Sequence, residues 1–444
     1  MKIAYIAAGA ANMYCGTCLH DNTLASSLRA AGHDVLLVPT YTPIRTDEEN
    51  VSISRVFFGG INVYLQQKSA LFRHTPWCVD SLLDSRPLMR WLSNRRASVD
   101  PKQLGEITVS MLKGEEGRQR KELAKLVRWL RREQPDVVHL SNAMLISMAP
   151  RIRRYVKAAI VCGLSGEDVF LEQLDEPHYS RARDLLRRHA AEASAYVALN
   201  RYYADFMTGY MDLDPDRVHV IPHGLLLDGH GRIGKRAEKE AYTIGYFARV
   251  CPEKGFHLLV DAFNILNEDP SLPPLKLVAA GYLADDDRPY FEEHRGRLAS
   301  WGLADRFTYL GEPDRAEKIR ILQSFDCMSV PTVYRESKGL SVLEAMANGV
   351  PVVQPAHGAF PELIEDTGGG LLFEPEDPVS LADAMRRLIK NPALAEELGG
   401  NGHHAVQHRY HADAMAENTL RLYEELCRDN GQGAVEGARS VSNV

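Results

Sequence analysis

The chain has 444 residues, of which 45% are hydrophobic and 25% charged, and its formal net charge is −7. Its length exceeds what one ordinary hydrophobic core accommodates, so we expect two domains. The composition is typical of a soluble globular protein, and no apolar run approaches the ~20 residues that a membrane-spanning helix requires. Seven cysteines, an odd number scattered along the chain, favour reduced thiols in a cytoplasmic protein over a disulfide framework.

The charge is unevenly distributed between the two halves of the chain. Residues 1–220 contain 29 Lys+Arg and 25 Asp+Glu, whereas the remaining residues contain 23 and 34. The first half is therefore the better candidate for contact with an anionic partner.

The first residues predict the start of a doubly wound α/β sheet. Lys2 to Ala8 is a short apolar run with one charge, which indicates a strand and not a signal peptide. A loop of small residues follows, then a helix that ends near Ala30 and a strand from Val35 to Val38. Strand, small-residue loop, helix and strand in this order are typical of a parallel sheet covered by helices.

Two cysteines near this loop, Cys15 and Cys18, have the spacing of redox and metal motifs. The sequence supplies no second ligand pair at metal spacing, so we favour a loop that contacts a ligand. A redox pair, a metal site and incidental cysteines are the alternatives.

Residues 118–134 predict a basic amphipathic helix, since seven of the first fifteen are Lys or Arg. The apolar side chains fall on one stripe: Leu123, Leu126, Val127 and Leu130. Such a helix can lie on anionic lipid. It runs directly into a predicted strand that ends at Leu140, and a helix that covers a sheet needs the same stripe turned inward. We favour the structural helix and keep the membrane surface as the alternative.

Polar residues end two further predicted strands of this half. His139 lies at the end of one strand, where a hydrogen-bonded core histidine is more common than a catalytic one. The strand from Ala158 to Leu164 leads to Ser165, Glu167 and Asp168. Ligands of open α/β sheets bind beyond the carboxyl ends of strands, so these side chains are candidates for contact with a hydroxyl group.

The second half begins after a polar linker, residues 225–240, which contains three glycines. Thr243 to Phe247 predicts a strand, and Arg249 and Lys254 follow it. Arginine can bind phosphate oxygens with a planar fork and lysine as a point charge, so this strand end suits a diphosphate.

Three consecutive carboxylates, Asp285 to Asp287, suggest either a metal-binding motif or the beginning of a helix. We favour the helix, because acidic residues there complement the helix dipole.

The segment from Asp326 to Pro351 carries the most specific signal. A short apolar strand, a loop and a helix beginning near Gly339 succeed one another, with Glu336 in the loop and Glu344 on the helix. Carboxylates can accept hydrogen bonds from sugar hydroxyls. The backbone N–H groups at the start of the helix suit a phosphate: those of Ser337, Lys338, Gly339 and Leu340. The combination predicts a site for a nucleotide-sugar.

These residues resemble a known family. Glu336 and Glu344, eight residues apart and followed by Ala-Met-Ala-Asn-Gly-Val-Pro-Val-Val, are similar to the signature of glycosyltransferase family 4, whose members are retaining enzymes. Arg249, a gap and then Glu-Lys-Gly resemble the family's second signature. The resemblance implies the GT-B fold, with two Rossmann-like, doubly wound parallel-sheet domains that face each other across a cleft.

The resemblance also implies a division of the chain. Residues 1–222 would form the acceptor-side domain, 223–240 the linker and 241–404 the nucleotide-sugar domain. A helix over 405–428 would cross back to the first domain, and Gly224 at the junction could take backbone angles that other residues avoid. The Gly/Ser/Asn-rich tail 429–444 is expected to be disordered.

By the same resemblance, the enzyme would transfer a sugar with retention and without a metal or other cofactor. Arg249 and Lys254 would stabilise the diphosphate, helped by the N–H groups of the helix start. Glu336 would hold a donor sugar hydroxyl and Glu344 the ribose hydroxyls. Gly16 would admit the diphosphate closely.

The acceptor side is predicted more loosely. Ser165 stands where the family usually has a histidine near the donor sugar, while His139, Glu167 and Asp168 are left as acceptor contacts. Residues 41–117 would face the acceptor, with two short strands around Gly59-Gly60 and then tryptophans and arginines: Trp77, Arg86 to Trp91 and Arg95-Arg96. A surface excursion is the alternative.

The predicted substrates are a nucleoside diphosphate sugar, with UDP-sugars as the default, and a hydroxyl of a glycan, lipid or small molecule. Nucleic acid is not an expected partner. A cytoplasmic protein with peripheral contact at the inner face of the membrane, through the basic first domain, fits the charge distribution. Two other functions are kept: a non-catalytic nucleotide-sugar-binding partner subunit, and an epimerase or phosphorylase on the same scaffold.

Overall fold

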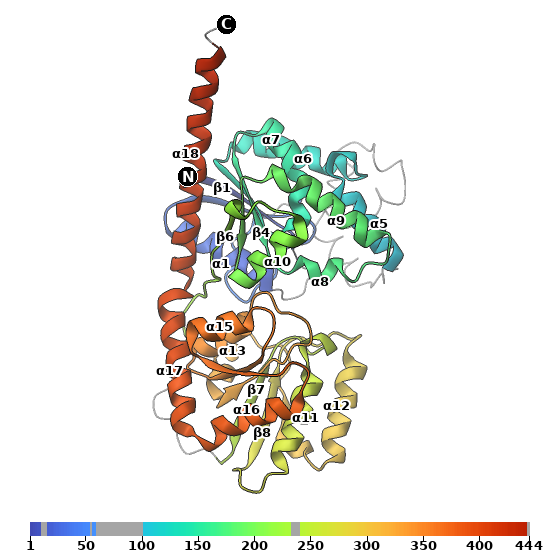
Figure 1. The fold of residues 1–444 in the computed structure, drawn as a ribbon, viewed down its shortest axis with the longest axis vertical. Helices are drawn as coiled ribbons and strands as arrows, with labels where there is room; N and C mark the ends of the chain where they lie inside the picture. Colours follow the sequence, from blue (N-terminus) through green and yellow to red (C-terminus); the bar gives the residue numbers. More distant parts are fainter. Residues whose placement is uncertain (10–15, 54–55, 59–100, 232–239, 442–444) are drawn as a thin grey trace. The chain divides into compact units, whose positions relative to one another are not determined.

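A computed structural model describes residues 1–9, 16–53, 56–58, 101–231 and 240–441 of the chain. The chain folds into two compact units, and each unit is built around a parallel sheet of six strands (Figure 1). The first unit comprises Met1–Ile221 and Met415–Val444, and the second comprises Pro222–Ala414.

The sheet of the first unit has the strand order β2-β1-β3-β4-β5-β6. Its strands are β1 (Lys2–Ala7), β2 (Asp34–Pro39), β3 (Val137–Leu140), β4 (Ala159–Leu164), β5 (Ala195–Ala198) and β6 (Val218–Val220). Every residue of β3, β4 and β5 is buried, as expected for parallel strands covered on both faces. The covering helices include α1 (Gly16–Ala30), α5 (Pro101–Leu112), α6 (Arg120–Glu133), α7 (Ala149–Tyr155), α8 (Glu167–Leu171), α9 (His178–His189) and α10 (Arg201–Met211).

Helix α6 turns its apolar stripe into the core of this unit. Leu123, Leu126, Val127 and Leu130 are all buried in the same hydrophobic cluster. The helix therefore uses its apolar face to cover the sheet, as the favoured interpretation predicted, and that face is not available for insertion into lipid. The opposite stripe of the helix carries exposed arginines: Arg120, Arg128, Arg131 and Arg132.

The sheet of the second unit has the order β12-β11-β10-β7-β8-β9. Its strands are β7 (Tyr242–Phe247), β8 (Leu275–Ala280), β9 (Phe307–Tyr309), β10 (Cys327–Met328), β11 (Val352–Pro355) and β12 (Gly370–Phe373). Its helices include α11 (Phe256–Asn267), α12 (Arg288–Ser300), α13 (Arg315–Ser324), α14 (Leu340–Ala347), α15 (Phe360–Thr367) and α16 (Pro378–Lys390). Asp287 immediately precedes α12, so the three carboxylates lie at a helix N-terminus.

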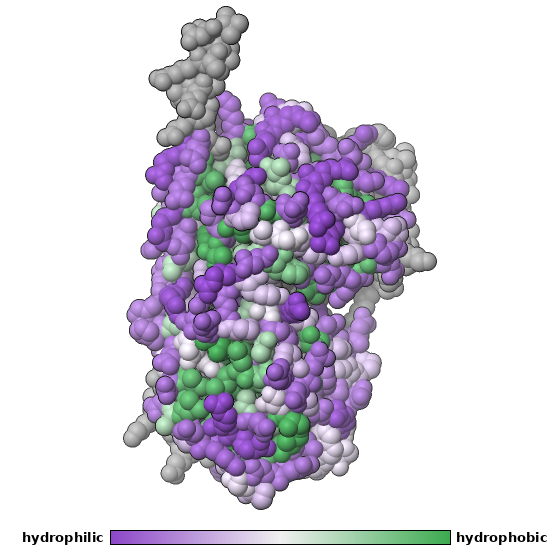
Figure 2. Space-filling view, viewed as in Figure 1, coloured by the Kyte–Doolittle hydropathy of each residue, from purple (hydrophilic) through white to green (hydrophobic). Residues whose placement is uncertain are grey.

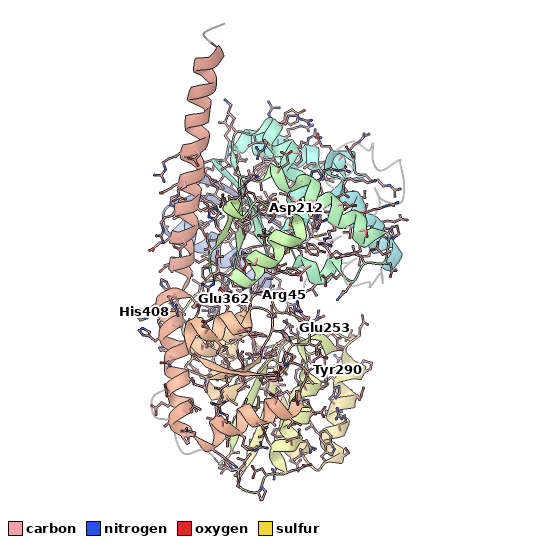
Figure 3. The ribbon with its side chains drawn as sticks, viewed as in Figure 1. Arg45, Asp212, Glu253, Tyr290, Glu362 and His408 are labelled. Carbon is pink, nitrogen blue, oxygen red and sulfur yellow. The ribbon has the colours of Figure 1, made fainter. Side chains whose placement is uncertain are left out.

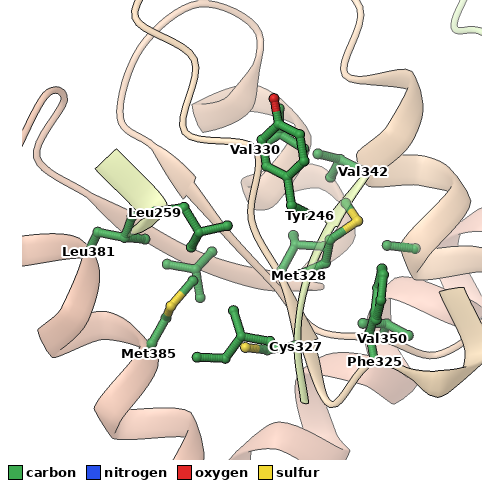
Figure 4. Packing of buried hydrophobic residues seen from close by; sticks show 14 of the residues in the cluster. Tyr246, Leu259, Phe325, Cys327, Met328, Val330, Val342, Val350, Leu381 and Met385 are labelled. Carbon is green, nitrogen blue, oxygen red and sulfur yellow. The ribbon is translucent and has the colours of Figure 1, made fainter. Parts of the chain in front are cut away.

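The core of the second unit lies between the central strands and the helices that cover them. Figure 4 shows Tyr246 of β7 and Met328 of β10 in the same buried cluster as helix residues such as Leu259 and Met385. Hydrophilic side chains predominate on the face drawn in Figure 2, as expected when the large apolar side chains fill the two cores. In the part of the chain that the structure describes, no helix is long and apolar enough to cross a bilayer.

The end of the chain differs from the sequence prediction. Instead of one helix over 405–428, the structure has α17 (Pro392–Arg409) and α18 (Ala412–Val441). The break is held by the linker, because Leu225 N donates to Tyr410 O (2.8 Å) and Ala412 N donates to Leu225 O (2.9 Å). The predicted disordered tail also differs: α18 continues past residue 429, since extending an existing helix requires no new nucleation.

Gly224 is needed at this junction for a reason other than the predicted one. Its backbone is not among the positive-φ glycines of the described residues. A Cβ atom there would lie 2.4 Å from the carbonyl oxygen of His411. Close approach of two backbone segments, and not an unusual backbone angle, therefore excludes a side chain.

Candidate active site

The candidate site lies at the carboxyl edge of the second unit's sheet. β7 and β10 are parallel neighbours, with Cys327 paired to Ile244, so the loops that follow them leave the same edge. The loop after β7 carries Arg249 and Lys254, and the loop after β10 carries Glu336. The sequence alone could not place these loops side by side, because the strand order is a tertiary property.

Lys254 and Glu336 form an ion pair, with Nζ 2.7 Å from Oε2. Tyr334 completes a triangle of hydrogen bonds. Its hydroxyl accepts from Lys254 Nζ (2.5 Å) and donates to Glu336 Oε2 (2.7 Å). The ammonium also lies 4.9 Å from the centre of the Tyr334 ring. Tyr334 was not identified from the sequence, since only its neighbours in space reveal its role.

The pair keeps both groups charged despite partial burial. Burial by itself would raise the pKa of Glu336, but the Lys254 charge and the hydrogen bonds from Lys254 and Tyr334 outweigh it and lower this pKa to about 2. Burial would lower the pKa of Lys254, and the Glu336 carboxylate instead raises it above its ordinary value. At neutral pH the site therefore holds a carboxylate and an ammonium in contact.

The second oxygen of Glu336 corrects one expectation. Oε1 accepts hydrogen bonds from the backbone N–H groups of Ser337 and Lys338, each at 3.1 Å. These two groups are therefore engaged by the neighbouring carboxylate and not free to receive a phosphate, because a loop carboxylate easily reaches the amides that follow it. The first N–H groups of α14, at Leu340 and its cap Gly339, have no acceptor inside the helix.

The loop after β11 holds Glu336 in place. Gly358 has a φ of 62°, and a Cβ atom there would lie 2.6 Å from the carbonyl oxygen of Glu336. The N–H of Ala359 donates to that same oxygen at 2.8 Å, and His357 Nε2 is 2.9 Å from Thr332 O. Only glycine allows this approach in this backbone conformation.

Arg249 lies in the loop after β7 with an exposed side chain. Its Nε is 3.1 Å from the sulfur of Cys251, and its NH2 group is 3.5 Å from Glu253 Oε2; Glu253 is labelled in Figure 3. The N–H of Val333 donates to Glu253 O at 3.0 Å, which ties this loop to the one after β10. Gly255 permits the contact, since a Cβ atom there would lie 1.7 Å from Pro331 O.

Glu344 does not join Lys254 and Glu336. It lies on α14 and pairs with Lys318 of α13, with Nζ 2.6 Å from Oε1 and both side chains 6% exposed. Such burial is tolerated because each charge neutralises the other. Lys318 was not identified from the sequence, where it is one of several charges on a polar helix.

In the first unit, Glu167 and Asp168 are buried and already hydrogen-bonded. Glu167 accepts from the N–H groups of Ala143 (2.8 Å) and Ser165 (2.6 Å), and Tyr203 donates its hydroxyl to Asp168 Oδ1 (2.6 Å). Burial raises the pKa of Glu167. These contacts hold the two carboxylates in place at the end of β4.

His139 is 2% exposed and packs inside the first unit. Its ring stacks on Tyr5 at 4.4 Å, and Nδ1 lies 2.5 Å from the hydroxyl of Tyr423 on α18. Burial, with the nearby His20, lowers the pKa of His139 to about 3, so the ring is neutral at pH 7. The contacts are those of the core histidine favoured from the sequence.

Two other predicted residues of the first unit, Gly16 and Ser165, lie at the ends of secondary-structure elements. Gly16 is the first residue of α1, and Ser165 follows β4 with a partly buried side chain. Cys18 is a buried thiol, whereas Cys15 lies outside the described residues. Within the described ranges no group of three or more His, Cys, Asp or Glu side chains could hold a metal ion. The predicted acceptor-facing residues Gly59 to Arg96 also lie outside the description.

Comparison with known proteins places this geometry in context. Residues 232–405 match the family described as Glycosyl transferases group 1, and residues 22–224 match the Glycosyl transferase 4-like domain. A D-inositol 3-phosphate glycosyltransferase of Actinosynnema mirum is 32% identical over 245 residues, which are 52% of this chain and 58% of that protein. A phosphatidyl-myo-inositol mannosyltransferase of Mycobacterium leprae is 31% identical over 216 residues, 46% of this chain and 53% of that protein. The matches thus span little more than half the length of these relatives.

Solved structures agree over nearly the whole chain. Sucrose-phosphate synthase from Thermosynechococcus elongatus has a TM-score of 0.71 and 18% identity, with 96% of this chain and 99% of that chain covered. The Anabaena protein HepE in complex with UDP has a TM-score of 0.67 and 18% identity, with coverage of 96% and 100%. At this level of identity the likeness shows the fold, and it confirms the predicted GT-B architecture.

Proposed function

Because the chain belongs to the family Glycosyl transferases group 1, we propose that it transfers a glycosyl unit from a nucleoside diphosphate sugar to an acceptor hydroxyl. The contact between Lys254 and Glu336 at the carboxyl edge of β7 and β10 carries the proposal. It offers an ammonium for a phosphate beside a carboxylate for a sugar hydroxyl. UDP is the proposed nucleotide, supported by the UDP bound to the structural neighbour HepE.

The cations would act on the leaving group. As the bond between the anomeric carbon and the phosphate oxygen breaks, negative charge grows on the diphosphate. Lys254 and Arg249, already fixed by neighbouring side chains, would stabilise that charge without reorganisation. The N–H groups of Gly339 and Leu340 would add to them at the start of α14.

The carboxylates would orient the donor. Glu336 would accept a hydrogen bond from a hydroxyl of the transferred sugar. Glu344 would accept from the ribose through the oxygen that Lys318 does not hold. Transfer would proceed with retention: the acceptor oxygen bonds to the anomeric carbon on the face that the phosphate leaves, and the leaving phosphate oxygen takes the acceptor proton. In this proposal no metal is needed, because the side-chain cations supply the positive charge.

The acceptor class follows from the names of relatives. Two of them are named for inositol-based acceptors, one of these a phosphatidylinositol. We propose a hydroxylated acceptor, either a small polyol or its phosphate, or the head group of a lipid.

A donor screen followed by turnover tests the function. UDP-, GDP- and ADP-sugars would be compared by thermal shift, because a ligand that binds the native state raises the melting temperature. Release of nucleoside diphosphate that depends on added acceptor would support a transferase. Binding without any release would indicate a partner subunit, and conversion of the donor without acceptor would indicate an epimerase. Release that requires inorganic phosphate would indicate a phosphorylase.

The role of Lys254 has its own variant. Lys254→Ala should lower kcat by about 10²–10³-fold, the loss typical of one preorganised group that stabilises transition-state charge. Lys276→Ala is the matched control, since Lys276 is an exposed lysine of β8 in the same unit. Equal turnover of the two variants would contradict the role.

We also propose that the protein is cytoplasmic and contacts the inner face of a membrane through α6. The outward face of this helix carries arginines at helical spacing, and all four are exposed: Arg120, Arg128, Arg131 and Arg132. A row of arginines suits a surface of anionic lipid head groups. This contact would be electrostatic, because the apolar stripe is buried.

Vesicle flotation tests that surface. Vesicles of phosphatidylcholine with phosphatidylglycerol should retain the protein at low salt, whereas phosphatidylcholine alone should not. The triple variant Arg128→Gln, Arg131→Gln and Arg132→Gln should lose binding, while a second-unit triple variant should keep it: Arg295→Gln, Arg320→Gln and Arg387→Gln. Equal binding of both triple variants would rule out α6 as the contact.

A further inference from the structure

Tyr334 is the one member of the triangle at the site that neither family signature contains. It is partly buried, and its hydroxyl contacts both charged groups: Lys254 Nζ at 2.5 Å and Glu336 Oε2 at 2.7 Å. A tyrosine hydroxyl has one proton to give and can accept in return. Here the hydroxyl donates a hydrogen bond to the Glu336 carboxylate and accepts one from the Lys254 ammonium. Both its donor and its acceptor capacity are therefore used.

The hydrogen bonds of Lys254 show what the hydroxyl contributes. An ammonium has three protons, and two of them are directed to Tyr334 and Glu336. These two bonds fix the nitrogen, and the third proton is left for an oxygen from outside the triangle. Without the tyrosine, the flexible lysine side chain would be held by Glu336 alone.

Glu336 depends on the same hydroxyl. Its Oε1 is held by two backbone N–H groups and its Oε2 by Lys254 and Tyr334. A diphosphate that draws the Lys254 ammonium toward itself would weaken the bond to Oε2. The hydroxyl of Tyr334 would then keep Oε2 in place, because it donates its hydrogen bond directly to the carboxylate and independently of Lys254.

We infer that Tyr334 is a positioning residue, which holds the Lys254 ammonium and the Glu336 carboxylate in the geometry that binds a sugar diphosphate. The inference rests on the proposed function for its consequences in turnover. The geometric part, a hydroxyl that orients two charged groups, does not depend on which reaction follows.

The variant Tyr334→Phe separates the hydroxyl from the ring. Phenylalanine retains the ring and removes only the hydroxyl with its two hydrogen bonds, so the packing of the loop is preserved. We expect kcat to fall about tenfold, the effect of losing one hydrogen bond to a charged group, with a smaller change in the donor KM. Tyr334→Ala should lose both contributions and be less active than Tyr334→Phe.

The dependence of kcat on pH distinguishes a positioning residue from a merely structural one, because loss of a merely structural residue would not shift the acid limb. The hydroxyl helps to lower the pKa of Glu336. Its removal should raise that pKa and move the acid limb of kcat to higher pH. Tyr242→Phe, at the amino end of β7 and hence at the opposite edge of the sheet, should change neither kcat nor the limb.

A titration independent of turnover distinguishes this inference from the proposed function. The carboxyl carbon of Glu336, labelled with 13C and assigned through Glu336→Gln, would be followed by NMR in the wild type and in Tyr334→Phe. A higher pKa in the variant supports the positioning role even if no donor is turned over. An unchanged pKa overturns it, also in a protein that proves to be an active transferase.

Discussion

At the scale of single residues, the ion pair between Lys254 and Glu336 determines the charge of the candidate site. The side chains are 24% and 12% exposed, so the contact is only partly screened by water. Glu336 also receives bonds from Tyr334 and two backbone amides. A site with fixed charges of both signs can bind a ligand that itself carries an anion and hydroxyl groups.

The pairing predicts how stability depends on pH. The pKa of Glu336 is lowered from 4.5 to about 2, so the ionised group stabilises the folded state above pH 4.5, and this contribution is lost as the pH falls toward 2. Relative to Glu336→Gln, the wild type should be more stable at pH 7 by about 1–3 kcal/mol, and the difference should shrink below pH 4.5.

Urea unfolding at several pH values measures that difference. Glu397→Gln serves as the control, because Glu397 is exposed on α17. A Glu336→Gln difference that stays constant from pH 7 to pH 3 would show that the carboxylate is not stabilised by its partners.

Single residues also differ in how far the sequence could predict their roles. Glu336, Lys254 and Arg249 could be predicted as site candidates from their spacing at strand ends, and the structure brings Lys254 and Glu336 into contact. Tyr334 and Lys318 could not, since their importance lies in the neighbours that they meet in space. Glu167 and Asp168 had the same local signals as a ligand site, and the sequence did not reveal the backbone amides and the Tyr203 hydroxyl that hold their carboxylates.

At the scale of elements, two contacts join loops and helices of the second unit, and a change of side chain at either contact should be poorly tolerated. The buried pair of Lys318 and Glu344 joins α13 to α14. Gly358 brings the loop after β11 against the backbone of Glu336. Each contact leads to a separate experiment.

Lys318→Met should leave Glu344 as an uncompensated buried charge. We expect a loss of about 3–5 kcal/mol in the free energy of unfolding, the typical cost of removing one partner of a buried pair. Adding Glu344→Leu should recover most of this loss, because the stranded charge is then gone. Denaturant unfolding measures both. For comparison, Asp285→Asn in the exposed pair with Arg288 should cost less than about 1 kcal/mol.

Gly358→Ala should displace the loop that carries Glu336. Its Cβ atom would meet Glu336 O at 2.6 Å, in a backbone conformation that already disfavours alanine. Gly302→Ala provides the matched control: φ is 72° there as well, and a Cβ atom would meet nothing within 4 Å. Both variants should lose about 1 kcal/mol from the backbone alone, and only Gly358→Ala should also lose turnover. Equal activity would show that the loop adapts without consequence.

Secondary structure was predicted best where periodicity is strong. The apolar stripe of α6 and the strands of both sheets follow directly from the sequence pattern. The division between α17 and α18 did not, because it results from hydrogen bonds to Leu225, which is far away in the chain. Helix α5, in the segment with the weakest signals, was not predicted either.

At the scale of the whole molecule, two sheets and two family matches account for most of the chain. The predicted GT-B fold is confirmed, since doubly wound sheets leave a clear alternation of strands and helices in the sequence. The resemblance also implied that a helix near residues 405–428 returns to the first unit, and α18 does so from Met415 onward. α18 follows the second unit in the chain and yet supplies Met415, Leu422 and Tyr423 to a core that also contains β1 and β3.

Truncation tests that contribution. A chain that ends at His411 should lose the Tyr423 contact to His139 and expose apolar surface of the first unit, so we expect aggregation or a lower melting temperature. A chain that ends at Asp429 retains those contacts and should behave like the wild type. Size-exclusion chromatography with thermal unfolding compares the two. An intact, monomeric first unit in the shorter chain would contradict the structural role of α18.

The place of α18 in the chain has a consequence during synthesis. A ribosome makes the sheet of the first unit early, but the helix that completes its core is translated only after the second unit. The nascent first unit must therefore persist in an unfinished state while nearly two hundred further residues of the second unit, Pro222–Ala414, are added. In the cell, chaperones would find a binding surface on the first unit until α18 has been made and packs into its core.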